Sequence, residues 1–301
     1  MTTNQTANLG RHAVNRIGFG AMQLAGPGVF GPPRDPEAVR AVLRRAIDLG
    51  VDHVDTSQYY GPNVVNELIR EALAPYPAGL RIVSKVGAKR DDTGAWLPAQ
   101  RPQELRAGVE ENLATLGIES LAAVNLRLLD HGSGPLVPLA EQLGTMEDLR
   151  REGKIEGIGI SNADRATVEE ALELVDLVCV QNAFSIVQRE SRDVLDLCAE
   201  HDIAFVPFFP LGSAFTGGPA AIAALPQVAS VAEKHGVTTS QVALAWLLHH
   251  DPHILLIPGT SSVAHLEENM GAVGVSLDDD DMAALDQVRQ TADPLQAAHE
   301  R

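Results

Sequence analysis

The sequence predicts a single domain over residues 1–301, a (β/α)8 barrel of the α/β class with an N-terminal β-hairpin and extra C-terminal helices. Short apolar segments alternate with amphipathic segments along the whole chain, and eight strand–helix pairs can be counted. This alternation indicates a parallel sheet that is covered on its outer face. A chain of 301 residues is also an ordinary length for one closed α/β barrel.

An open, doubly wound sheet is the alternative fold. It would bind a dinucleotide through a Gly-x-Gly-x-x-Gly turn between its first strand and first helix. Here Gly18-Phe-Gly20 lacks the third glycine and leads into a loop rich in Gly and Pro rather than into a helix. The sequence therefore favours the closed barrel.

The elements follow in order from a predicted hairpin over 5–16, which turns at Gly10-Arg11, and a first core strand at 17–24. The first helix, over 36–49, has apolar residues at helical spacing, and a later helix over 239–250 begins with Thr238 and Gln241, the spacing of a capping box. A long loop containing Trp96 is expected at 87–101, and a Gly/Pro loop at 210–219. The remaining strands are predicted at 51–55, 81–86, 121–128, 155–161, 177–182, 203–208 and 254–257, and the remaining helices at 63–74, 103–116, 136–151, 164–175, 190–201, 226–235, 262–271 and 278–289.

The composition excludes several classes of protein. A formal net charge of -17 argues against nucleic acid or an anionic membrane as partner, because both need clustered Lys and Arg. The two cysteines are too few for a disulfide framework, the ten histidines show no metal-ligand clustering, and no apolar run approaches the ~20 residues of a membrane span. The polar N-terminus has no signal-peptide pattern. We expect a cytoplasmic protein with a small-molecule substrate and no metal; its oligomeric state stays open.

Chemistry in such a barrel lies at the C-terminal ends of the strands. Asp55 ends the second predicted strand, Lys85 ends the third, and Tyr60 follows Asp55 by five residues. A carboxylate at a strand end needs solvent or a partner to stay ionised, and Lys85 is the candidate partner. Further polar residues follow other strands, and Phe208 and Phe209 follow the seventh, so this end suits an extended polar ligand with a flat ring.

Several motifs together resemble the aldo-keto reductase family. They are Asp55-Thr-x-x-x-Tyr60-Gly61, Ser84-Lys85, Gly157-Ile-Gly-Ile-Ser-Asn162, Gln181-Asn182, Pro210-Leu-Gly212, Val242-Ala-Leu-Ala-Trp246, and Ile257-Pro-Gly-Thr-Ser with Glu268-Asn269. They cover essentially the whole chain and come in the family's order. Within the family, the stretches 20–33, 124–127, 207–212 and 257–265 most resemble the bacterial NADPH-dependent pyridoxal reductases.

The resemblance implies a catalytic set of Asp55, Tyr60, Lys85 and Arg127. Tyr60 would protonate the carbonyl oxygen, Lys85 would lower the pKa of the Tyr60 phenol, and Asp55 would hold Lys85 in place. Tyr59 is the rival acid; Tyr60 is favoured because it stands five residues after the Asp and directly before Gly61.

Arg127 is the departure, because most of the family has a His at this position. A guanidinium exchanges no proton near neutral pH, but it can stabilise a developing oxyanion. The alternative is that Arg127 pairs with an acid such as Asp55 and only shapes the pocket. His131 could also serve as the missing histidine, although a loop histidine is usually solvated.

The resemblance further implies NADP(H) as cofactor, while NAD(H) stays open. The usual Lys and Arg that grip the 2′-phosphate are replaced by Gly259 and His265, and Glu267 and Glu268 lie nearby. The helix after residue 262 would offer its free amides to an anion. The expected cofactor contacts are Gly20, Met22, Asp55, Ser161, Asn162, Gln181, Phe208, Pro210, Leu211, Gly212, Pro258, Gly259, Thr260, Ser262, Glu268 and Asn269.

The implied reaction is reduction of an aldehyde to an alcohol with NADPH, with pyridoxal and pyridoxine as the best single guess. Phe30, Trp96, Phe209 and Phe215 are expected to line the substrate pocket, which suits a flat heteroaromatic aldehyde. One alternative is a redox-sensing barrel that keeps NADP(H) bound with little turnover. Another is a barrel hydrolase or isomerase, which would need paired carboxylates or metal ligands at the strand ends, where only Asp55 is found.

Overall fold

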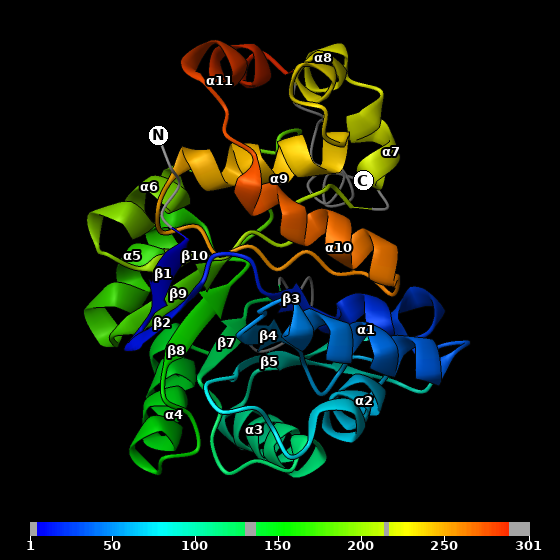
Figure 1. Ribbon diagram of the computed structural model, residues 1–301. Coiled ribbons are helices and arrows are strands. Elements are labelled where there is room, and N and C mark those ends of the chain that lie inside the picture. The colour runs from blue at the N-terminus through cyan, green and yellow to red at the C-terminus, as the bar shows by residue number, and fades with distance from the viewer. Residues whose placement is uncertain (1–4, 130–136, 214–216, 289–301) are drawn as a thin grey trace.

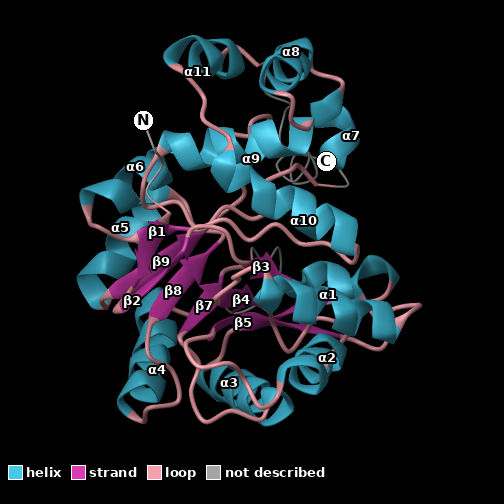
Figure 2. Cartoon of the chain, in the orientation of Figure 1, coloured by secondary structure: helices cyan, strands magenta, loops and turns pink. Residues whose placement is uncertain are grey.

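The computed structural model describes residues 5–129, 137–213 and 217–288, and its centre is a curled parallel sheet ringed by helices (Figure 1, Figure 2). Each strand pairs in parallel with the next one along the chain. The strands of this sheet are β3 (Phe19–Gly20), β4 (His53–Asp55), β5 (Arg81–Arg90), β7 (Ala123–Arg127), β8 (Ile158–Ser161), β9 (Leu177–Gln181) and β10 (Ala204–Phe205).

Residues 254–257 close this sheet into a barrel. They form isolated bridges rather than a regular strand, with Ile254 beside Phe205 on one side and Leu256 beside Ile17 on the other. The Leu255 amide donates to the Phe205 carbonyl at 3.0 Å, and the Gly18 amide donates to the Leu256 carbonyl at 2.8 Å. The first and last strands therefore meet, and the predicted (β/α)8 barrel is confirmed.

The predicted N-terminal hairpin is also confirmed, as β1 (Thr6–Leu9) paired antiparallel with β2 (His12–Asn15). Leu9 and Val14 are buried in one cluster with inward-facing barrel residues such as Val83 and Cys179. The Asn15 amide donates to both carboxylate oxygens of Asp52, which precedes β4, at 2.9 and 3.0 Å. The hairpin thus covers the N-terminal end of the barrel and leaves the C-terminal end open for chemistry.

Helices cover the outside of the barrel because each presents one apolar face to the strands. Helix α9 is the exception: its residues 242–248 are all buried, since it lies between the barrel and the outer helices α7, α8 and α11 (Figure 1). The expected capping box begins α9, with Thr238 and Gln241 each accepting the other's amide hydrogen. The helices are α1 (Pro36–Asp48), α2 (Val64–Leu73), α3 (Pro102–Leu116), α4 (Leu139–Arg151), α5 (Arg165–Leu174), α6 (Arg192–Glu200), α7 (Gly218–Ala223), α8 (Pro226–His235), α9 (Thr239–His250), α10 (Val263–Gly271) and α11 (Asp279–Asp286), with short 3-10 turns η1 (Ala21–Leu24), η2 (Pro27–Val29) and η4 (Ala272–Gly274).

The expectation of a loop at 87–101 is wrong. Strand β5 continues beyond the barrel to Arg90 and forms an antiparallel hairpin with β6 (Trp96–Ala99). Gly87 allows this departure: its φ is +99°, and a Cβ there would lie 2.4 Å from the Arg127 carbonyl oxygen of the neighbouring strand. Where β5 leaves the barrel it no longer packs against apolar neighbours. Its residues there are polar, so the sequence contains no pattern that predicts a strand.

Two smaller expectations also differ from the structure. The first core strand ends at Gly20, because residues 21–24 turn into η1. Helix α7 begins at Gly218, inside the expected loop at 210–219. Over the described ranges, the structure has no helix that is both long and apolar enough to cross a membrane.

Candidate active site

Asp55 and Lys85 form a buried ion pair at the C-terminal end of the barrel. Each residue is 4% exposed, and the Lys85 ammonium contacts Asp55 Oδ1 directly. Gln181 Nε2, from β9 across the barrel, donates to Asp55 Oδ2 at 3.0 Å. The two oxygens of the carboxylate are therefore held by different strands. The sequence-based pairing of Asp55 with Lys85 is present in the structure.

Tyr60 lies beside this pair, with the centre of its ring 5.5 Å from Lys85 Nζ. Burial raises the pKa of the Tyr60 phenol well above its ordinary value, the charge of Asp55 raises it further, and Arg127 opposes both. The expected lowering of this pKa by Lys85 is not found, because burial and the charge of Asp55 dominate; the charge of Lys85 acts instead on Tyr59, whose pKa it lowers against the effect of burial. Tyr60 consequently holds its proton at neutral pH, as a proton donor must.

Tyr59 is equally buried, and its ring packs edge-on against Tyr60 and Trp96, with centroids 5.4 and 5.3 Å away. Burial raises the pKa of the Tyr59 phenol as well. Its ring therefore supports both the candidate acid and the wall of the site. The positions of the two phenols do not show which of them is the proton donor. Substitution of each tyrosine by Phe distinguishes them.

Arg127, the last residue of β7, does not pair with Asp55, whose oxygens are occupied by Lys85 and Gln181. No carboxylate of residues 5–129, 137–213 or 217–288 lies within 4.0 Å of the Arg127 guanidinium. Its Nε is buried and has no acceptor in the same part of the chain. Its carbon Cζ lies 5.1 Å from the centre of the Trp96 ring. The proposed substitute His131 falls outside the described residues.

Two guanidinium groups lie over the ring of Trp96, those of Arg90 and Arg127. Arg90 Cζ lies 4.2 Å from the Trp96 ring centre and 5.4 Å from that of Phe30. The Arg90 guanidinium also donates to the carbonyls of Gly28, Val29 and Gly94 at 2.9–3.0 Å, which ties the loop carrying Phe30 to the β5–β6 hairpin. Sequence reasoning missed Arg90, since its position in an expected loop indicated only solvent exposure.

The other expected substrate residues lie elsewhere or outside the description. Phe209 follows β10, adopts a φ of +55°, and packs edge-on against Phe208 at 5.2 Å. Nothing joins it to Trp96 or Phe30, which come from β6 and the loop after β3. Phe215 lies outside the described residues. Of the expected aromatic set, the structure brings Phe30 and Trp96 together through Arg90.

The expected nicotinamide contacts meet at the ends of β8 and β9, where Ser161 and Gln181 are paired in register. Asn162 adopts a left-handed φ of +65°, with its amide donating to the Gln181 carbonyl at 3.1 Å and to Asn182 Oδ1 at 2.9 Å. Gln181 Oε1 is buried and lacks a partner among the residues described. A buried acceptor beside Asp55 fits the amide hydrogens of a carboxamide, the polar group of a nicotinamide ring.

The expected adenosine contacts lie along the closing segment and α10. Ser262 caps α10 by accepting the His265 amide hydrogen, and Thr260 Oγ1 accepts that of Ser262. The backbones of Gly20 and Gly259 touch, since a Cβ on Gly259 would lie 2.5 Å from the Gly20 carbonyl oxygen. The remaining members of the set are placed as follows: Met22 on η1, Pro258 before Gly259, Phe208, Pro210, Leu211 and Gly212 after β10, and Glu268 and Asn269 on α10.

The acidic residues near this segment are already engaged. Glu267 forms an ion pair with Arg45 at 2.7 Å, and Glu268 accepts a hydrogen bond from Thr238 at 2.6 Å. The expected repulsion of a phosphate by Glu267 and Glu268 is thereby reduced, because one charge is neutralised and the other carboxylate is held by a donor.

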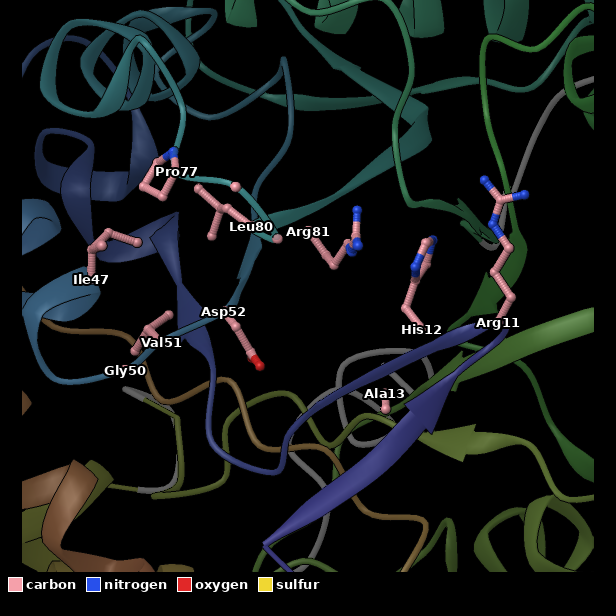
Figure 3. A pocket seen from close by; sticks show the side chains of 12 residues that line it. Arg11, His12, Ala13, Ile47, Gly50, Val51, Asp52, Pro77, Leu80 and Arg81 are labelled. Carbon is pink, nitrogen blue, oxygen red and sulfur yellow. The ribbon is translucent and has the colours of Figure 1, made fainter.

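A cavity lies at the opposite end of the barrel and contains none of the expected site residues. Its volume is about 530 Å³, and Arg11, His12, Asp52 and Arg81 project into it beside an apolar wall (Figure 3). These residues belong to the hairpin and to the starts of β4 and β5, which is the N-terminal end. Conserved chemistry in barrels is found at the other end.

Comparison with known proteins gives concordant matches over the whole chain. Residues 16–290 match the Aldo/keto reductase family. The chain is 48% identical to pyridoxine 4-dehydrogenase of Escherichia coli over 94% of this chain and 98% of that protein. It is 36% identical to an uncharacterized oxidoreductase of Schizosaccharomyces pombe, over 98% and 94% of the two chains.

Solved structures give the same fold. A thermostable aldo-keto reductase crystallised with the inhibitor epalrestat is 30% identical, with a TM-score of 0.78 over 93% of this chain and 98% of that one. An aldo/keto reductase of Klebsiella pneumoniae, crystallised with NADP and acetate, is 24% identical, with a TM-score of 0.78 over 96% and 98% of the chains. At that identity the second match supports the fold alone.

Proposed function

The chain belongs to the aldo/keto reductase family of oxidoreductases, and from this premise we propose that it reduces an aldehyde to an alcohol with NADPH, pyridoxal being the substrate and pyridoxine the product. The single observation that carries the proposal is the buried Asp55–Lys85 pair beside the phenol ring of Tyr60, whose centre lies 5.5 Å from Lys85 Nζ. Identity of 48% to pyridoxine 4-dehydrogenase over nearly the full length of both chains supports the substrate.

The chain's own residues divide the work of the reaction. When bound, NADPH supplies a hydride to the carbonyl carbon. Tyr60 donates its hydroxyl proton to the carbonyl oxygen, so that with the hydride the C=O group becomes CH–OH. Arg127 provides a fixed positive charge that stabilises the negative charge developing on the carbonyl oxygen. The same charge stabilises the phenolate that Tyr60 becomes after it gives up its proton. Asp55 and Lys85 form the base of the site, and Tyr60 regains its proton from solvent.

The cofactor is proposed to lie across the C-terminal end of the barrel. Gln181 Oε1 would accept from the carboxamide, with Ser161 and Asn162 beside it, and Phe208 would stack on the nicotinamide ring. The start of α10 would bind phosphate through its free amides. NADP(H) is proposed as the cofactor, and the binding of Glu267 by Arg45 and of Glu268 by Thr238 reduces the repulsion that these carboxylates would exert on its 2′-phosphate.

The decisive experiment is NADPH oxidation at saturating cofactor with pyridoxal and a panel of other aldehydes. Wild type, Tyr60→Phe and Tyr59→Phe are compared, and cofactor binding is measured separately by NADPH fluorescence. We expect Tyr60→Phe to lose activity by a factor of about 100 to 10,000 with cofactor binding retained. Tyr59→Phe, which keeps the packed ring, should retain most of the activity.

The reverse pattern, with activity lost only in Tyr59→Phe, would transfer the role of acid to Tyr59. Tight NADPH binding without turnover of any carbonyl compound would reject the reductase and favour a redox-sensing barrel. The same titration with NADH compares the two cofactors directly.

A further inference from the structure

Arg127 carries a hydrogen-bond donor that no group in the described part of the chain accepts. The donor is Nε–H, which is buried away from solvent. A buried donor without an acceptor is unfavourable, because the water that it loses is not replaced. Such an atom in an active site indicates that the acceptor arrives with the ligand.

The position of this guanidinium limits what the acceptor can be. Arg127 Cζ lies 5.1 Å from the Trp96 ring, and its positive charge opposes the rise in pKa of both Tyr59 and Tyr60. The guanidinium therefore lies beside Trp96, and its charge acts on both phenols. A substrate that binds both Tyr60 and Arg127 would carry this acceptor close to its reacting carbonyl, and Trp96 beside Arg127 suits an aromatic substrate.

We propose that Arg127 selects aromatic aldehydes that bear a hydroxyl group ortho to the carbonyl, by binding that oxygen as its anion while Tyr60 binds the carbonyl oxygen. In such a molecule the two oxygens lie side by side in the plane of the ring. A planar guanidinium, with several N–H groups in one fork, matches this pair better than a single-donor group does. The inference rests on the proposed reductase function and names its substrate class.

The same argument explains why this chain has Arg127 where a histidine is usual in the family it resembles. A histidine ring nitrogen offers one donor, and the ring is charged only when protonated. Arginine keeps its charge at every pH of interest, so it can hold an anion beside the carbonyl. Pyridoxal belongs to this class, since its ring hydroxyl and its aldehyde occupy adjacent carbons.

The test compares kcat/KM for 2-hydroxybenzaldehyde and 4-hydroxybenzaldehyde, which have the same atoms and differ only in where the hydroxyl stands. Wild type, Arg127→Met and Arg127→Lys are measured. We expect Arg127→Met to reduce the ortho-to-para ratio by about tenfold or more, the usual effect of losing one charged hydrogen bond. Arg127→Lys keeps the positive charge but loses the planar set of N–H donors. Its ortho-to-para ratio of kcat/KM should therefore lie between those of wild type and Arg127→Met.

Intrinsic differences between the two aldehydes cancel, because only the change in their ratio between variants is interpreted. Lys89→Met is the matched control: it removes a long cationic side chain from β5, close in sequence to the site, whose partner is the surface residue Glu104. Its ratio should equal that of wild type. An equal loss for both aldehydes in Arg127→Met would overturn the proposal, since Arg127 would then act only on the carbonyl oxygen.

A second readout needs no turnover. The absorption band of the 2-hydroxybenzaldehyde phenolate is followed as a function of pH, bound to the protein with NADP⁺, which has no hydride to transfer. We expect the phenolate to appear at lower pH on wild type than in free solution, and this shift to disappear in Arg127→Met. Identical titrations on the two proteins would reject the inference even if every aldehyde were reduced; a shift without any reduction would instead reject the proposed function.

Discussion

At the N-terminal end of the barrel, several charged side chains of the hairpin and the neighbouring segments bind partners within the chain. Glu156 binds both Arg11 and His12, at 2.6 and 2.7 Å. Both oxygens of Asp52 accept the Asn15 amide hydrogen. These contacts join the hairpin to the N-terminal ends of the strands, beside a cavity of about 530 Å³ (Figure 3).

The C-terminal end is built differently. The Asp55–Lys85 pair is shut away from water, and Arg127 and Gln181 each keep a buried polar atom that is unsatisfied within the described chain. Unsatisfied buried groups reduce stability, and such atoms also occur elsewhere, as at His53 Nε2 and Ser120 Oγ. Those of Arg127 and Gln181 differ because they lie at the same end as the buried Asp55–Lys85 pair, where a ligand can supply the missing partner. The cavity of about 530 Å³ lies at the N-terminal end, whereas the buried ion pair lies at the strand ends at which barrels carry out chemistry.

The largest effect is expected from Lys85→Met, which breaks the C-terminal ion pair. Removing one partner of a buried pair leaves an uncompensated charge and costs about 3–5 kcal/mol of the free energy of unfolding. Urea unfolding measures this loss, and the NADPH assay should show activity lowered by at least about 100-fold. The double variant Asp55→Asn, Lys85→Met should recover stability without activity. A fully active Lys85→Met would show that the pair is structural only.

The counterpart at the other end is Arg16→Met. The buried Arg16 guanidinium donates to the Ile254 carbonyl at 3.0 Å and contacts the Asp251 carbonyl. Losing these bonds leaves buried acceptors unsatisfied, at about 1–3 kcal/mol. We expect lower stability in urea with unchanged kcat/KM at 25 °C, since Arg16 lies far from the reacting end. A drop in kcat/KM as large as that of Lys85→Met would remove the contrast between the two ends.

A smaller effect is expected from Glu156→Gln. The carboxylate is one-quarter exposed and its partner Arg11 is mostly exposed, so the pair contributes about 0.2–1 kcal/mol. The thermal midpoint should fall by about 4 °C or less, with no change in activity. A loss of several kcal/mol would mean that His12 and Glu156 hold the hairpin against the barrel more strongly than a surface pair can.

The smallest effect is expected from pH on the reduction rate. The pKa of Tyr60 is raised in the folded protein, so the phenol stays protonated and kcat/KM should show no fall from this group between pH 7 and 9. By the same sign, the stability that comes from keeping this phenol neutral is complete below the unfolded pKa of about 10 and is lost as pH rises above it. A decline in kcat/KM centred between pH 7 and 9 that disappears in Tyr60→Phe would contradict the raised pKa.

The fold could be predicted from the spacing of apolar residues within each segment and from the length of the chain. Alternating apolar and amphipathic segments located every strand that the structure has in the barrel, and Thr238 with Gln241 located the start of α9. The β5–β6 hairpin could not be predicted in the same way, because Trp96 and its neighbours leave the core and follow no buried face. The closing residues 254–257 were recognised as apolar, although they form bridges rather than a regular strand.

The sequence predicts which residues meet in the candidate site better than it predicts how their charges act on one another. Asp55, Lys85 and Gln181 meet as the strand ends suggested. The predicted lowering of the Tyr60 pKa is wrong, because burial and the nearby Asp55 carboxylate raise this pKa more than Arg127 lowers it. The burial of a phenol depends on how the whole molecule packs, which the sequence pattern does not show. Arg90 was missed for the same reason: its three carbonyl partners come from two loops that only folding brings together.

The seam between the first and last strands has a consequence for synthesis. Arg16 and Ile254, which are bonded across this seam, are 238 residues apart in the chain. A nascent chain that stops at His250 therefore carries a sheet with two open edges, and open edges pair readily with other chains. We expect such a ribosome-stalled chain to be cleaved rapidly by protease, and extension past residue 257 to confer resistance. The barrel can therefore close only after residues 254–257 have been synthesised.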